Sequence, residues 1–130
     1  MQAIKDELLV REVALNPPAT EDAIAQINFW AGGKLHSHFV QILREFDGFS
    51  DWNYEEKSFV SVWSVEKALS DGWTRRPMLA FSDWSISAMV FAFDPSSNGP
   101  IISIEDARIV APTYAEFWSR LLSDSLFQTK

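Results

Sequence analysis

The stretch from Arg76 to Ile104 constrains the fold more than any other part of the chain. Its middle segment, Ile86 to Phe93, is apolar at both alternating sets of positions, which is typical of a strand covered on both sides. The short apolar run Pro77 to Phe81 precedes it across the link Ser82 to Ser85, and Ile101 to Ile104 follows a dense group of turn-forming residues. The stretch therefore predicts three consecutive strands in an antiparallel meander, with the middle strand near the centre of a sheet.

Apolar residues at helical spacing, bounded by capping residues and glycines, predict four helices around this meander. They cover Glu21–Ala31 after Thr20, Leu35–Phe46 before Gly48, Val65–Leu69 after Ser64 and Tyr114–Leu122 after the Thr113-x-x-Glu116 capping box. Two further strands are expected at Phe59–Trp63 and Ala107–Ala111, and the tail after Asp124 is expected to fray. The N-terminal segment, Ala3 to Leu15, fits either a short helix or an edge segment.

This order of elements predicts an α+β fold, because helices and strands are grouped separately along the chain. A chain of 130 residues has the length of one domain, so we expect a single domain 1–130 with its core at about 16–124. We expect an antiparallel or mixed sheet of about four to six strands, with the helices packed mainly on one side.

The net charge of −7 limits the classes of partner. An acidic chain repels phosphate backbones, so we expect no binding to nucleic acid. The same charge would attract a basic protein and accelerate its docking. The alternative is that modest acidity only keeps a small protein in solution.

The termini and the apolar runs give an expected location. The segment Met1 to Glu7 lacks the apolar core of a signal peptide, and the longest apolar run is too short to span a bilayer. The chain has no cysteine, which fits a reducing compartment. We therefore expect a cytoplasmic protein without membrane contacts, either a monomer or a weak homodimer.

Known catalytic and metal-binding patterns are missing from the sequence. There is no Gly-x-Ser-x-Gly and no phosphate-binding loop, and carboxylate pairs such as Asp83 with Asp94 occur in any acidic protein. His36 and His38 are two residues apart in a predicted helix, so their side chains should point to nearly opposite sides and should not share a metal ion. The sequence therefore predicts no cofactor, no metal and no enzymatic activity.

The segment from Glu45 to Glu56 has the composition of a binding loop, with five acids, no bases and the interleaved aromatic residues Phe49, Trp52 and Tyr54. Aromatic anchors inside a polar rim are typical of protein interfaces. The alternative is a solvated loop whose rings fold back onto the sheet. The predicted partner-binding residues are Asp47, Asp51, Trp52, Tyr54, Glu55 and Glu56, with Asp83 and Trp84 in the strand link as second choices.

The run from Leu35 to Gly48 resembles the helix signature of the SUKH superfamily, typically written Leu-Pro-x-x-Tyr-x-x-Phe-Leu followed by Asn-Gly. Three positions match and three carry conservative replacements: Leu35, Leu43 and Gly48, and Phe39, Ile42 and Asp47. His36 departs from the signature, since it replaces the proline.

Other segments resemble the same superfamily in the same order. The similar segments are Asn16–Glu21 before the first helix, Phe59–Leu69 as a strand and short helix, Asp94–Ile104 as a turn and strand, and Ala111–Leu122 as the final helix. Together they extend over nearly the whole chain, from Asn16 to Asp124.

The resemblance implies a compact α+β domain without enzymatic activity. Members resemble immunity proteins that neutralise secreted bacterial toxins, often nucleases, and others are fungal regulators of cell-wall synthesis. The resemblance does not identify any catalytic or binding residue in this chain. We therefore expect an immunity-type protein that binds a basic toxin domain, with two alternatives: a housekeeping scaffold for an endogenous partner, and a small hydrolase with a deep pocket and a carboxylate of raised pKa.

Overall fold

The computed structural model of the chain describes residues 2–55, 58–84, 89–123 and 125. Within these residues the chain forms five helices and one antiparallel sheet of six strands, which confirms the predicted α+β class. The helices are α1 (Gln2–Val10), α2 (Glu21–Trp30), α3 (Ser37–Glu45), α4 (Val65–Ser70) and α5 (Tyr114–Leu122). The strands are β1 (Phe49–Glu55), β2 (Ser58–Val62), β3 (Leu79–Trp84), β4 (Met89–Phe93), β5 (Ile101–Ser103) and β6 (Arg108–Ala111).

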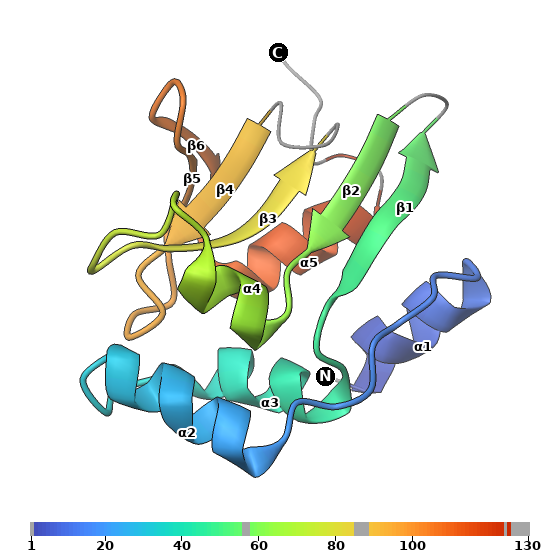
Figure 1. Cartoon of the computed structure of the whole chain (residues 1–130). Coiled ribbons are helices and arrows are strands. Elements are labelled where there is room, and N and C mark those ends of the chain that lie inside the picture. The colour runs from blue at the N-terminus through green and yellow to red at the C-terminus, as the bar shows by residue number, and fades with distance from the viewer. Residues whose placement is uncertain (1, 56–57, 85–88, 124, 126–130) are drawn as a thin grey trace.

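The strands follow one another across the sheet in chain order, and each pairs antiparallel with the next (Figure 1). The predicted meander is confirmed as β3, β4 and β5, with β3 and β4 at the centre. Of the predicted middle strand, residues 86–88 lie outside the described residues, as does the tail for which fraying was predicted, apart from Ser125. The N-terminal segment takes both predicted forms, because it forms α1 and then a bridge from Leu15 to Phe49 at the β1 edge.

The predicted capping residues begin their helices. The Thr20 and Thr113 hydroxyls accept hydrogen bonds at 3.0 Å from backbone N–H groups three residues later. Ser64 does the same for α4, where its hydroxyl accepts from Lys67 N–H at 3.2 Å. Such local bonds satisfy backbone donors that a helix start leaves unpaired, which explains why the sequence predicts these positions well.

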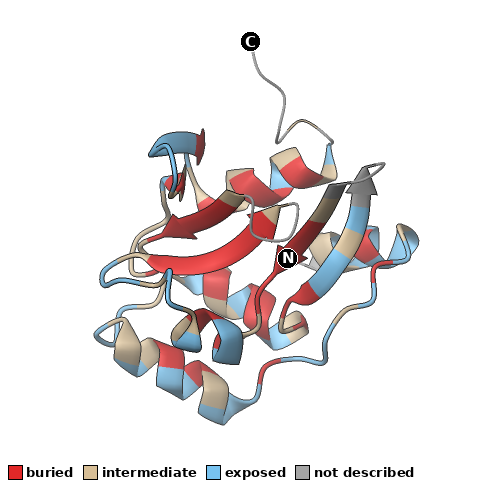
Figure 2. Cartoon of the chain, turned by 45° about the horizontal axis from the view of Figure 1, so that its top comes forward, coloured by how far each residue is buried: buried red, intermediate tan, exposed pale blue. Residues whose placement is uncertain are grey.

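The last helix, α5, covers one face of the sheet with aromatic residues. Phe117 and Trp118 are fully buried, and the Phe117 ring makes edge contacts with Phe81 and Phe91 at centroid distances of 5.1 and 6.0 Å. The helices α1 and α3 both contact α5. We call this side of the sheet the covered face; Figure 2 shows how much of β3, β4 and α5 is buried.

The opposite side of the sheet, which we call the pocket face, carries the alternate residues. Val60 and Val62 of β2 lie on the covered face, so Ser61 between them points to the other side, together with its partner Asp83 in β3. At one end of the sheet α4 contacts β3 and α2. The two faces of the same strands therefore differ in chemistry, with valines on one and polar groups on the other.

Two segments predicted as loops belong to the sheet. The link Ser82 to Trp84 is the end of β3, where the buried Ser82 hydroxyl donates to the Ser61 carbonyl at 2.7 Å. Most of the segment Glu45–Glu56 is β1 and not a loop. Both predictions were wrong for the same reason: pairing with β2 outweighs the turn-forming composition of these residues.

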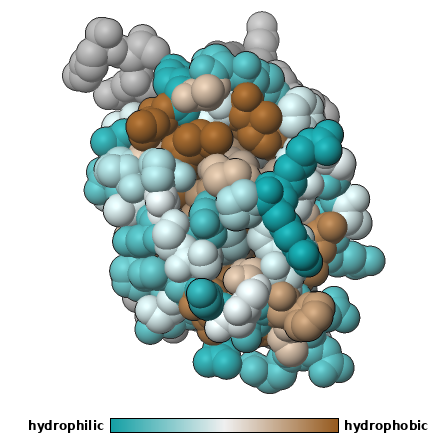
Figure 3. Space-filling model, turned by 90° about the vertical axis from the view of Figure 1, so that its left-hand side faces the viewer, coloured by the Kyte–Doolittle hydropathy of each residue, from teal (hydrophilic) through white to brown (hydrophobic). Residues whose placement is uncertain are grey.

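The far edge of the sheet exposes apolar side chains. Ile109 of β6 is 61% exposed and pairs with the partly exposed Ile102 of β5. Figure 3 shows strongly apolar residues gathered on this side of the molecule. Among the described residues no strand pairs with β6 on its other side, and the Val110 carbonyl accepts a hydrogen bond from Arg120 Nη1 at 2.8 Å.

Candidate functional site

A row of three polar side chains crosses β1, β2 and β3 on the pocket face. Ser61 in the middle strand is paired in register with Asp83 of β3. On its other side, Asp51 of β1 donates its backbone N–H to the Ser61 hydroxyl at 2.8 Å, and that hydroxyl lies 3.4 Å from Asp51 Oδ1. Two carboxylates thus flank one small hydroxyl.

The position of Asp51 depends on an irregularity in β1. The register with β2 shifts between Phe49 and Trp52, so Ser50 and Asp51 together oppose Ser61. Asp51 has a φ of 52°, a left-handed conformation that Asp and Asn adopt more readily than most residues. The bulge explains why simple alternation does not reveal β1 in the sequence.

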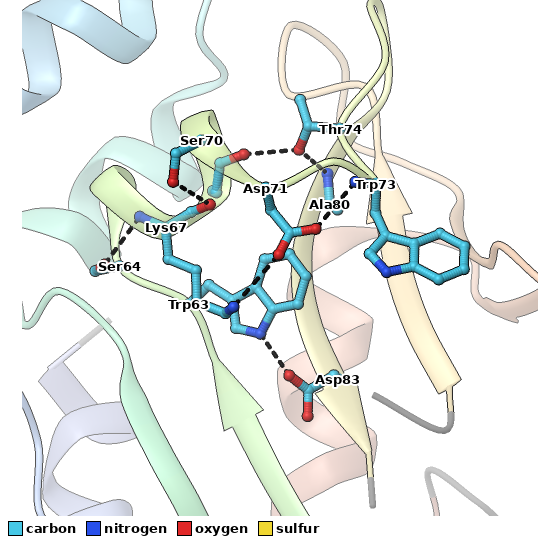
Figure 4. A network of polar contacts seen from close by, with 10 residues as sticks. Trp63, Ser64, Lys67, Ser70, Asp71, Trp73, Thr74, Ala80 and Asp83 are labelled. Atoms are coloured by element: carbon cyan, nitrogen blue, oxygen red, sulfur yellow. Dashed lines mark hydrogen bonds and ion pairs between the residues drawn. The ribbon is translucent and has the colours of Figure 1, made fainter. Parts of the chain in front are cut away.

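Asp83 is held by Trp63, the residue that follows β2. The indole Nε1–H of Trp63 donates to Asp83 Oδ2 at 2.6 Å, and Asp83 is only 6% exposed (Figure 4). A buried carboxylate needs such a donor, because leaving it without a partner would cost several kcal/mol.

Trp63 also faces a cation from α4. The Lys67 ammonium lies 4.5 Å from the centroid of the Trp63 ring and 3.3 Å from Asp71 Oδ2 (Figure 4). The Lys67 side chain remains 51% exposed. The indole therefore bonds to an anion through its N–H and attracts a cation to its face.

These groups surround a cavity of about 270 Å³. Its lining is formed by Asn16, Ser50, Asp51, Ser61, Trp63, Ser64, Lys67 and Asp83. The lining contains two carboxylates and one ammonium group, and the ammonium already has Asp71 as a partner outside the lining. This chemistry suits a polar or cationic group better than an apolar one.

Backbone contacts at Gly48 fix α4 beside the cavity. Gly48 has a φ of 79°, and a Cβ atom there would lie 2.1 Å from the Val62 carbonyl oxygen, so only glycine fits. The next residue back, Asp47, accepts a hydrogen bond from Val65 N–H at 2.9 Å through Oδ1. The turn after α3 therefore positions both β1 and the first residue of α4.

Asp47 has a structural position in the fold. Its backbone N–H donates to Pro17, and its carbonyl accepts from Asn16 Nδ2 at 2.8 Å. Burial raises the pKa of the Asp47 carboxyl, against the lowering effect of the Val65 hydrogen bond and with a smaller raising effect from Glu66. Asp47 lines a separate cavity of about 360 Å³ between α2 and α4, so the predicted binding residue lies outside the row of Asp51 and Asp83.

The structure separates the other predicted binding residues. Trp52 and Trp84 flank Val60 on the covered face, where they pack against the core. Tyr54 and Glu55 lie in β1, but their side chains lie outside the described part of the structure, as does all of Glu56. Of the predicted set, the cavity brings together only Asp51 and Asp83.

Sequence reasoning missed the other residues that line the cavity, among them Ser61, Trp63 and Lys67. The available signal was the spacing of Trp63 and Lys67 around the capping residue Ser64, since a helix capped there turns its third residue back toward the preceding strand end. The contribution of Asp83 could not be found this way, because it depends on the register of β3.

The two histidines are closer than the sequence predicted. The structure places their ring centroids 5.1 Å apart, since His36 is the N-cap of α3 and not part of the helix. Its Nδ1 accepts the backbone N–H of His38 at 3.2 Å. In the part of the chain that the structure describes, no group of three or more His, Asp or Glu side chains is placed to hold a metal ion.

Comparison of the sequence with protein-family models and with curated proteins gives no match. Among the described helices, none has the length and apolar character that a membrane-spanning segment requires.

Proposed function

We propose that this chain is a non-catalytic binding protein of the SUKH immunity type, which neutralises a basic toxin domain in the cytoplasm by direct contact. The observation that carries the proposal is the acidic row on the pocket face, where Asp51 and Asp83 flank a cavity in a chain of net charge −7. A toxic nuclease tends to be basic because it must bind a phosphate backbone, so an acidic protein surface can occupy the same groove.

Electrostatic attraction also fits the task of an inhibitor. Complementary charge raises association rates well above those of neutral proteins, which favours fast capture of a toxin at low concentration. The chain supplies the other element of a strong interface as well, since Trp63 lines the cavity beside the carboxylates. Tryptophan is among the residues that dominate binding energy in well-packed, desolvated pockets of an interface.

The test is capture of the partner followed by an inhibition assay. The tagged chain is incubated with lysate of the source cells, eluted with rising salt, and the eluate is identified by mass spectrometry. We expect a basic domain that leaves only at high salt, because screening weakens charge attraction, and whose toxic activity is lost when the purified chain is added in equal amount.

A different result would point to the scaffold function. An endogenous partner that resists salt and whose activity the chain does not inhibit would contradict the immunity proposal. A variant that removes one negative charge away from the cavity, Asp22→Asn, serves as the bait control, since Asp22 is exposed on α2.

A further inference from the structure

We propose that the cavity on the pocket face is the anchor site for one arginine side chain of the protein partner. The proposal rests on the proposed function, since it specifies how a basic partner would be held. It assigns a ligand chemistry to the cavity itself.

The strand spacing sets the width of the site. Neighbouring strands lie about 4.8 Å apart, so the backbones of Asp51 and Asp83, on either side of Ser61, are separated by about 10 Å. Ser61 is the smallest of the three side chains and leaves room above it. A side chain that enters over Ser61 would have one carboxylate on each side.

The aromatic wall favours a planar cation. The Trp63 ring already holds the Lys67 ammonium 4.5 Å from its centroid, which shows that this indole face accepts positive charge in the folded protein (Figure 4). A guanidinium can stack on such a ring while its N–H groups reach carboxylates in the same plane, whereas an ammonium group acts as a point charge. Arginine therefore uses both parts of the site, the indole face and the two acids.

The Lys67 ammonium lies over the Trp63 ring but is not confined there. Its side chain is half exposed, and its charge is also compensated by Asp71 at 3.3 Å. The ammonium can thus leave the ring while it keeps its carboxylate partner. We infer that Lys67 competes with the incoming guanidinium for the indole face.

The charge of the site supports the same ligand. Asp83 is 6% exposed and Asp51 is exposed, so one carboxylate lies at the base and the other at the rim. A guanidinium between them would gain charge-assisted hydrogen bonds in a partly desolvated site, where such bonds are strongest.

The experiment is a titration of the ¹⁵N-labelled full chain, followed through the Trp63 indole N–H signal in NMR spectra. The probes are three capped tripeptides, Gly-Arg-Gly, Gly-Lys-Gly and Gly-citrulline-Gly, at constant ionic strength. Citrulline keeps the shape of arginine without its charge. The Trp63 signal is assigned with Trp63→Phe, and we expect it to shift saturably with the arginine peptide and more weakly with the other two.

The variants test each carboxylate. Asp51→Asn and Asp83→Asn keep the side-chain shape, and the amide oxygen introduced by Asp83→Asn can still accept the Trp63 hydrogen bond. Each should lower the affinity for the arginine peptide roughly tenfold, as expected for the loss of one charge-assisted hydrogen bond. The control Asp22→Asn changes net charge equally and should leave the affinity unchanged. Lys67→Met should raise it severalfold, because the competing ammonium is gone.

Several outcomes would overturn the proposal. They are equal binding of the lysine peptide, an equal loss in Asp22→Asn, a shift confined to other indole signals, or weaker binding in Lys67→Met. If the peptide fails while the chain still captures and inhibits a basic domain, the anchor site is wrong and the proposed function stands. If the peptide binds as expected but no toxin is inhibited, the anchor site is correct and the proposed function is wrong.

Discussion

The two faces of the same strands differ in chemistry. On the covered face, Val60 and Val62 of β2 belong to the same buried core as the aromatic residues of α5. One residue further along, on the pocket face, Ser61 lies between two carboxylates. Because side chains alternate along a strand, one strand carries core residues on one face and candidate binding residues on the other. The binding residues can therefore change without a change in the core.

Two buried tryptophans show the difference in detail. Trp118 in α5 has no exposed surface and contacts Phe46 and Phe117, both at a centroid distance of 5.8 Å. Trp63 is 5% exposed, but its neighbours are a carboxylate and an ammonium group. Both rings contribute stability through buried contact area, and Trp63 adds a hydrogen bond to a charged group.

The largest effect is expected on the covered face. Trp118→Ala should lower the free energy of unfolding by about 3–5 kcal/mol, because it leaves a cavity within the aromatic cluster. Urea unfolding followed by circular dichroism measures the change. A loss smaller than that caused by Trp63→Phe would contradict the difference between the faces.

A smaller effect is expected on the pocket face. Trp63→Phe keeps an aromatic ring but removes the indole N–H that donates to the buried Asp83, so we expect a loss of about 1–3 kcal/mol at neutral pH. The double variant Trp63→Phe/Asp83→Asn should recover part of this loss, because an amide costs less than a carboxylate without the indole donor. If Asp83→Asn lowers stability as much in the Trp63→Phe background as in the parent, the lost hydrogen bond is not the cause of the Trp63→Phe effect.

The stability that the Asp47–Val65 hydrogen bond gives to the start of α4 should depend on pH. Asp47→Ala removes the acceptor for Val65 N–H and should cost about 1 kcal/mol. Asp47→Asn keeps the acceptor and removes the charge whose burial is unfavourable, so at neutral pH it should be as stable as the parent or more stable.

The sign of the pH dependence follows from the raised pKa. The folded state binds the Asp47 proton more tightly than the unfolded state, so this group's contribution to stability falls as pH rises from 3.8 through the raised folded pKa. Any advantage of Asp47→Asn should therefore shrink as the pH is lowered toward 3.8. Urea unfolding at a series of pH values tests this, and an advantage that grows on acidification would contradict it.

The smallest effect is expected at the exposed edge. Ile109→Lys should change the free energy of unfolding by no more than about 0.5 kcal/mol, since Ile109 is 61% exposed. Sedimentation of the parent and the variant then measures whether β6 contributes to weak self-association. A large loss of stability would show that this part of the sheet is more tightly packed than its exposure indicates.

Local signals made most of the fold predictable from the sequence. The capping bonds of Thr20, Ser64 and Thr113 involve residues three positions apart, so the sequence contains both partners. The apolar runs of the meander were likewise recognisable, because burial on both faces leaves little alternation.

The missed features depend on contacts between distant segments. β1 was hidden by the left-handed Asp51 and its bulge, which form only against Ser61 of the next strand. The candidate site joins Asp51, Lys67 and Asp83 from two strands and a helix. Their acidity made Asp51 and Asp83 candidates from composition, but only the register of three strands places them around one cavity, and the same register puts Trp52 and Trp84 on the covered face.

The consecutive order of the strands also affects how the chain folds. Each strand pairs with its neighbour in the sequence, so most pairings close a short loop and carry a small entropic cost. The exception is the pairing of β2 with β3, which must close around α4 and the residues up to Leu79. That pairing also completes the row of Asp51, Ser61 and Asp83. The cavity therefore forms only after the pairing with the largest loop-closure cost has formed.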